Sequence, residues 1–90
     1  MLFELGRVVA TQDAVDAMKE NNVNITELLI KHAGGDWAML SDEDRLENEH
    51  SVKNGWRILS SYPINKSGDK VWIITEADRS STCVLLPKDY

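Results

Sequence analysis

The chain has 90 residues, of which 42% are hydrophobic and 28% charged, and its formal net charge is -5. This length allows one domain, residues 1–90, with one thin core, and the composition excludes collagen-like, low-complexity and disordered chains. The negative charge repels phosphate backbones, and the ten Lys and Arg residues form no basic run, so we expect no direct nucleic-acid binding.

The cysteine count and the first ten residues indicate the compartment. The single cysteine, Cys83, excludes a disulfide within one chain, which suits a reducing cytoplasm. The stretch "MLFELGRVVA" lacks a basic segment, contains Glu4 and is too short for a signal peptide or a membrane span. We therefore expect a soluble cytoplasmic protein without membrane contact.

The first half of the chain predicts a strand followed by helices. Residues 5–10 are typical of a strand, with a bend at Gly6. Thr11 suits the N-cap of a helix that runs to about residue 22. A second helix follows Asn24, with apolar residues at helical spacing and Gly34 as its left-handed stop.

A third helix begins after Ser41 and ends at Asn54 and Gly55. Leu46 and Val52 are its only large hydrophobic residues. Most of its surface must therefore face water or a partner.

Strand patterns occupy residues 56–87, joined by the turn "NKSGDK" and by the octet "TEADRSST". Together with residues 5–10 they predict a four-stranded antiparallel sheet. Two or three helices must then pack on one face of this sheet to bury its apolar side. The expected fold class is α+β.

Acidic residues gather around the third helix. Six carboxylates lie within fourteen residues, against Arg45 alone: Asp36, Asp42, Glu43, Asp44, Glu47 and Glu49. Either this helix is simply solvated, or it is a docking surface for another protein with a basic surface. On the second interpretation the chain is a small adaptor or inhibitor rather than an enzyme.

The octet offers an alternative site. Residues 78–81 are typical of a turn, but Glu76 or Asp78 could serve as a base and Arg79 could hold an anion. Trp37 or Trp72 would then wall a pocket of a small enzyme or ligand-binding domain. A plain turn with a local ion pair explains the same residues.

The remaining reactive side chains favour structural roles. His32 lies on an apolar helix face, His50 lies in the acidic helix, and Cys83 has apolar strand neighbours. No metal-ligand spacing or phosphate-binding glycine loop is present, so we expect no metal and no cofactor. A homodimer is a further alternative, formed if the edge strand at residues 5–10 pairs with its copy.

Four stretches, "LGRVVAT", "LLIKHAGGDW", "NGWRILSSY" and "VWIITEADRSSTCVLLPKDY", resemble a group of small uncharacterised bacterial proteins that are often described as plasmid-related. The likeness spans nearly the whole chain and implies a bacterial, mobile-element setting. It implies no activity and no catalytic residues. In that setting, one concrete version of the adaptor or inhibitor hypothesis is anti-defence activity, in which the protein inhibits a restriction or CRISPR effector.

Overall fold

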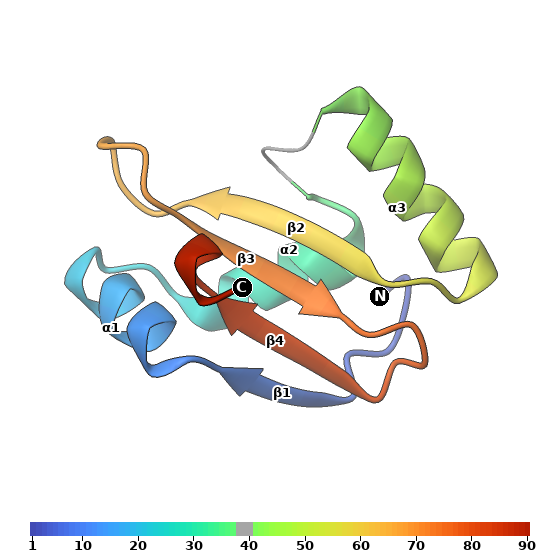
Figure 1. Ribbon diagram of the computed structural model, residues 1–90, viewed down its shortest axis with the longest axis horizontal. Coiled ribbons are helices and arrows are strands. Elements are labelled where there is room, and N and C mark those ends of the chain that lie inside the picture. Colours follow the sequence, from blue (N-terminus) through green and yellow to red (C-terminus); the bar gives the residue numbers. More distant parts are fainter. Residues whose placement is uncertain (38–40) are drawn as a thin grey trace.

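The structure is a computed structural model that describes residues 1–37 and 41–90 (Figure 1). Its strands form one sheet with the order β1-β4-β3-β2. The described residues thus confirm an α+β fold with three α-helices and a four-stranded sheet. In chain order the elements are β1 (Arg7–Ala10), α1 (Gln12–Glu20), α2 (Ile25–Gly34), α3 (Asp42–Asn54), β2 (Ile58–Pro63), β3 (Lys70–Thr75), β4 (Ser81–Leu85) and the 3-10 turn η1 (Pro87–Asp89).

The sheet is mixed, so the prediction of a purely antiparallel sheet is wrong. β2, β3 and β4 form an antiparallel meander, whereas β1 runs parallel to β4, with Arg7 opposite Ser81 and Ala10 opposite Val84. Short turns fix the direction of each strand in the meander. No turn joins β1 to β4, because all three helices and two strands separate them, and such a long connection permits a parallel pair.

The helices cover one face and one edge of the sheet. α1 and α2 pack on the same face, where Ala14, Met18 and Leu28 meet Tyr62 and Ile73 in the main core. We call this side the helix face, and the opposite side, where η1 lies, the η1 face (Figure 1). α3 lies alongside β2, at the edge of the sheet, so only two helices pack on a face as the sequence predicted.

The predicted helix starts are confirmed by their capping contacts. The side chains of Thr11, Asn24 and Ser41 each accept a hydrogen bond from a backbone N–H in the first turn of α1, α2 and α3. The stop of α2 differs from the prediction by one residue. Gly34 is the last helical residue, and Gly35 takes the left-handed conformation with φ of 92°.

A chain of buried polar side chains crosses the core beneath α2. His32 is fully buried, and its two ring nitrogens meet the hydroxyls of Ser60 and Thr75, the second at 2.8 Å. Thr75 bonds Thr82 at 2.7 Å, and Thr82 donates to the backbone oxygen of Leu5, also at 2.7 Å. The chain therefore ties α2, all three strands of the meander and the N-terminal segment together.

Donor counting fixes the direction of three bonds in this chain. Because the Leu5 carbonyl can only accept, Thr82 must donate to it and Thr75 must donate to Thr82. Thr75 then accepts from Nε2–H of His32. Burial lowers the pKa of His32 from 6.5 to about 4, so the ring is neutral at pH 7, and its Nδ1 accepts from Ser60.

We expect stability to fall as the pH is lowered from 6.5 towards 4. The pKa of His32 is lower in the folded chain than in the unfolded chain, so the unfolded chain takes up a proton first as the pH drops. Urea unfolding at pH 7.5 and pH 5 should show a loss of about 2 kcal/mol. His50→Ala, at an exposed position, should leave this loss unchanged. Equal stability at the two pH values would contradict the neutral, buried imidazole.

Candidate functional site

The contact between α3 and β2 combines one apolar residue with polar side chains, because Val52 of α3 packs against the apolar cluster that contains Ile58 of β2. Asn48 and Ser51 are the buried residues of α3. The side-chain amide of Asn48 donates to the backbone oxygen of Leu59, and its side-chain oxygen accepts from the Leu59 N–H at 3.3 Å. One carboxamide thus takes the place of a neighbouring strand. It closes part of the β2 edge and holds the acidic helix against the sheet.

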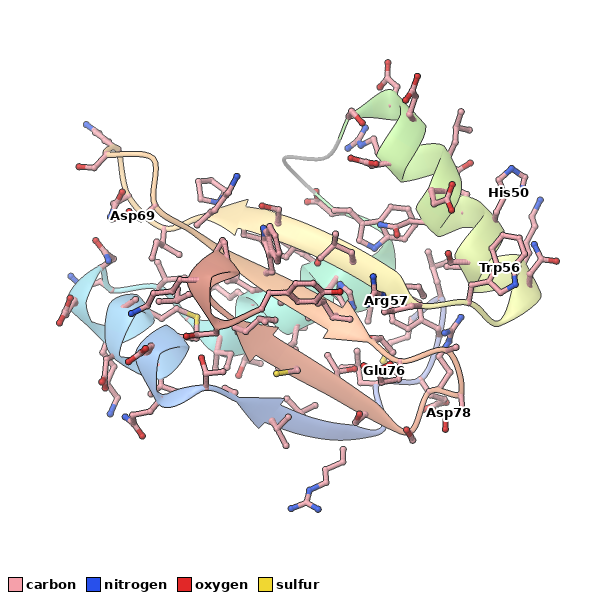
Figure 2. The ribbon with its side chains drawn as sticks, viewed as in Figure 1. His50, Trp56, Arg57, Asp69, Glu76 and Asp78 are labelled. Carbon is pink, nitrogen blue, oxygen red and sulfur yellow. The ribbon has the colours of Figure 1, made fainter. Side chains whose placement is uncertain are left out.

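A groove of about 350 Å³ lies between α3 and the start of β2. Acidic, amide, hydroxyl, aromatic and basic groups all contribute to its walls, and Trp56 is 51% exposed. Figure 2 shows Trp56 near the C-terminal end of α3, below His50, and Arg57 over the sheet. The lining residues are Asp44, Glu47, Asn48, Ser51, Trp56, Arg57 and Leu59.

Arg57 is held in place from the η1 face. Its guanidinium donates to the Tyr90 hydroxyl at 2.8 Å and lies 5.8 Å from the centre of the Tyr90 ring. Tyr90 in turn meets Trp72 edge-on, with ring centres 5.8 Å apart. These contacts orient the guanidinium of Arg57 toward Tyr90.

The structure divides the six acidic residues that the sequence grouped together. All six are exposed, but only Asp44 and Glu47 line the groove. The turn of 100° per residue in a helix places Asp42 and Glu49 on the opposite flank of α3, with Glu43 on the outer surface. Asp36 follows α2, where its backbone oxygen accepts from the Tyr62 hydroxyl at 2.7 Å.

Sequence reasoning missed Asn48, Trp56 and Arg57 as parts of a site. The signal that could have found them is "NGWR", in which a tryptophan and a basic residue directly follow the glycine that ends a helix. Nothing in the sequence distinguishes Asn48 from the other polar residues of its helix, because its role depends on a strand eleven residues away.

The octet forms a tight turn between β3 and β4 (Figure 2). Asp78 Oδ1 accepts from the Ser80 N–H at 3.0 Å, as in an Asx turn. Hydrogen bonds from the Ser80 side chain and backbone lower the pKa of Asp78, which makes its carboxylate a weak base. Glu76 is exposed at the same turn.

Arg79 anchors this turn to the rest of the molecule. Its guanidinium donates to four backbone oxygens, those of Ser51, Trp56, Glu76 and Ala77, at 2.6 to 3.1 Å. It also lies over the Phe3 ring, 5.5 Å from the centre. Ser51 belongs to the last turns of α3, where a cation is favoured by the helix dipole. The anion-binding role considered for Arg79 would have to compete with these contacts.

Two further features complete the surroundings of the turn. Gly6 is left-handed, and a Cβ there would clash with the backbone oxygens of Arg79 and Ser80, so the turn needs glycine at this position. Trp37 is buried on the helix face, where its indole donates to the His32 oxygen at 3.0 Å, whereas Trp72 lies on the η1 face. The two tryptophans therefore do not wall a common pocket.

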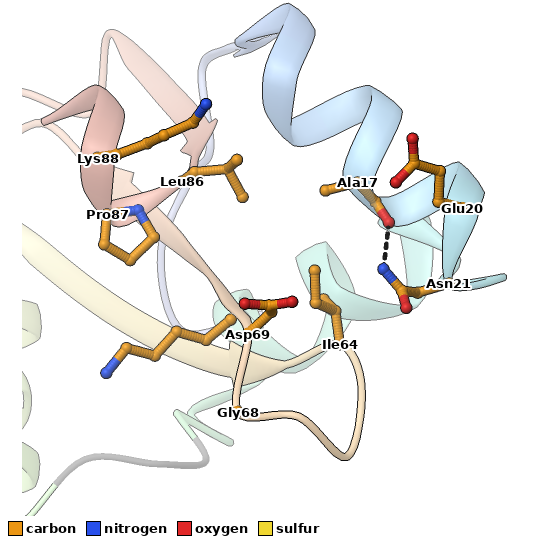
Figure 3. A pocket seen from close by; sticks show the side chains of 10 residues that line it. Ala17, Glu20, Asn21, Ile64, Gly68, Asp69, Leu86, Pro87 and Lys88 are labelled. Atoms are coloured by element: carbon orange, nitrogen blue, oxygen red, sulfur yellow. Dashed lines mark hydrogen bonds between the residues drawn. The ribbon is translucent and has the colours of Figure 1, made fainter.

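A second groove, of about 440 Å³, lies between α1, the β2–β3 turn and η1 (Figure 3). Three of its polar side chains bond within the chain. Asn21 donates to the Ala17 oxygen at 2.7 Å, and Asp69 accepts from Asn65 at 2.8 Å. At its rim Lys88 pairs with Asp13 at 3.1 Å.

Comparison with protein-family models, with curated proteins and with solved structures gives no match. Within residues 1–37 and 41–90, no helix is long and apolar enough to cross a membrane, and no cluster of three or more His, Cys, Asp or Glu side chains could hold a metal ion. Cys83 is half-buried, and burial raises the pKa of its thiol. We take the groove beside α3 as the candidate site, because it combines two exposed carboxylates with an exposed indole.

We expect Arg79→Ala to lower the free energy of unfolding by about 2 to 4 kcal/mol, because four backbone oxygens lose a charged donor. Arg79→Gly should be less damaging, since the backbone at this position is left-handed with φ of 61°. The exposed neighbour change Glu76→Ala should alter stability by less than about 0.5 kcal/mol. Urea unfolding measures all three. An Arg79→Ala chain as stable as Glu76→Ala would contradict the structural role.

Proposed function

We propose that this protein binds a basic segment of another protein in the groove between α3 and β2. One observation carries the proposal: the carboxylates of Asp44 and Glu47 line the same groove as the exposed indole of Trp56. A Lys or Arg side chain suits such a site, because carboxylates pair with its charge and an indole offers the strongest aromatic surface for a cation.

The rest of the groove supports binding rather than chemistry. The Ser51 hydroxyl donates to the Glu47 backbone oxygen at 2.9 Å, and Asn48 is occupied by Leu59. Arg57 is engaged by Tyr90. The two carboxylates and the indole are the groups of this groove that suit a cationic ligand, and Arg57, which keeps its charge, lies at the end of the groove beside Tyr90. A His or Cys that could act as base or nucleophile is missing from the lining residues.

The charge around the groove favours the same class of partner. Acidic residues surround the exposed sides of α3, and the chain carries a net charge of -5. Such a field speeds encounter with a basic surface and disfavours acidic partners. This chemistry fits an adaptor, or an inhibitor that occupies the basic groove of a nucleic-acid-handling enzyme. The mobile-element setting makes a restriction or CRISPR effector one concrete partner of this kind.

A matched pair of double variants tests the groove. Asp44→Lys with Glu47→Lys changes the groove wall, whereas Asp42→Lys with Glu49→Lys makes the same charge change on the other flank of α3. Each pair also removes one acid from the first helical turn, so both should perturb the helix equally. The probe is a short peptide of alternating Lys and Ser, with a Glu and Ser peptide as control. Binding is followed by NMR through the Trp56 indole signal.

We expect the Lys peptide to shift the Trp56 signal and the Glu peptide to leave it unchanged. The groove variant should weaken Lys-peptide binding by at least about tenfold, and the flank variant by less than about threefold. Trp56→Ala lacks this reporter and is measured by isothermal titration calorimetry beside the wild-type chain. It should weaken binding while the net charge is kept. Equal losses in the two double variants would show that net charge alone attracts the peptide, and would contradict the proposal.

A further inference from the structure

The two edges of the sheet differ in their protection (Figure 1). Asn48 of α3 occupies the β2 edge through both backbone groups of Leu59. β1 forms the other edge, and all four of its residues are exposed, with Val8 at 42% and Val9 at 41%. Within the described part of the chain, no strand or side chain pairs with the outer side of β1.

The backbone groups available at this edge follow from two hydrogen bonds. The Arg7 N–H donates to the Ser80 oxygen at 3.0 Å, and the Thr11 N–H donates to the Val84 oxygen at 2.9 Å. Alternate residues of a strand direct their N–H and C=O to opposite sides. Arg7, Val9 and Thr11 therefore bond β4, and Val8 and Ala10 direct their N–H and C=O outward.

We propose that β1 pairs with β1 of a second copy of this chain, antiparallel across a two-fold axis, so that the two sheets become continuous. The outward groups select the register. Val8 lies opposite Ala10 of the second copy, where the two residues exchange both backbone hydrogen bonds, and the symmetry repeats this pair. Val9 then lies opposite Val9 of the second copy, in the closely spaced position where two exposed side chains can cover each other.

Charge complementarity favours a second copy over an unrelated strand. Arg7 is paired with Ser81, and its side chain points to the η1 face, as does that of Thr11, four residues further along the chain. Thr11 donates to the Asp89 carboxylate in η1 at 2.8 Å. In the proposed register Arg7 lies opposite Thr11 of the second copy, and its guanidinium reaches the Asp89 carboxylate there. The two-fold axis makes this ion pair twice.

The Asp89 carboxylate is prepared for such a contact. The Thr11 hydroxyl and the Leu86 N–H, at 3.1 Å, both donate to its Oδ2 atom. These bonds, with the Thr11 side chain as the largest cause, lower the pKa of Asp89, so the group is ionised at neutral pH. Its second oxygen faces no donor in the described structure and is open to the guanidinium.

The dimer should be weak. β1 has only four residues, and a stable interface buries about 800 Å² on each partner. A short strand pair with two ion pairs falls below that size. The expected behaviour is an equilibrium that shifts to the monomer on dilution and at high salt.

A charge swap tests the register by sedimentation equilibrium over a concentration series up to about 1 mM, a range suited to a weak interface. The monomer mass is 10.2 kDa. Arg7→Glu and Asp89→Lys should each raise the dissociation constant at least about tenfold, and the combined variant should restore it to within about threefold. Lys66→Glu, in the β2–β3 turn, makes the same charge change as Arg7→Glu and should have no effect.

A proline at the edge tests the backbone pairing. Val8→Pro removes an outward N–H that has no partner within the chain, so the fold should be kept while the dimer is lost. Circular dichroism and thermal unfolding verify the fold of each variant. A wild-type chain that stays monomeric to about 1 mM overturns the proposal and leaves the edge to a strand of another protein. A dimer that resists both the charge changes and Val8→Pro overturns it as well.

Discussion

The carboxamide of Asn48 is the contact on which the arrangement of this molecule depends. A four-stranded sheet has two edges, and each exposes backbone groups that invite another strand. By bonding both backbone groups of Leu59, Asn48 closes the β2 edge at that residue and positions α3 there. The same contact creates the groove, since one wall comes from α3 and the other from the start of β2. α3 contributes only Val52 to the apolar cluster beside it, so the paired polar contact of Asn48 adds to this small hydrophobic burial in holding the helix.

In the interior, the buried chain of hydroxyl and imidazole groups joins separate elements through hydrogen bonds, as Asn48 joins α3 to β2 at the edge of the sheet. It links His32 on α2 to three strands and ends on the carbonyl of Leu5, so the N-terminal segment is fixed to the core. Arg79 holds that segment from the other side through Phe3, and it also caps the last turns of α3. A chain of 90 residues can bury only a thin hydrophobic core, and these polar links supply the specificity that such a core lacks.

The sequence predicted the local structure better than the contacts between elements. Thr11, Asn24 and Ser41 cap the helices as expected, because capping depends on neighbouring residues. The direction of β1 was missed because the period of two that reveals a strand contains no information about which strand it joins. In the candidate site, Asp44 and Glu47 were part of the predicted acidic surface. Trp56, Arg57 and Asn48 were not, since their roles arise only when α3 lies beside β2.

The central claim is the contrast between the β2 edge, which Asn48 closes at Leu59, and the open β1 edge, and amide hydrogen exchange tests it most directly. At low protein concentration the Leu59 N–H should exchange slowly although it lies on an edge strand, and the Val8 N–H should exchange rapidly. Asn48→Ala should speed exchange at Leu59 by at least about tenfold and leave Ser60, on the alternate side of the same strand, protected. Rapid exchange at Leu59 in the wild-type chain, or slow exchange that survives Asn48→Ala, would contradict the account.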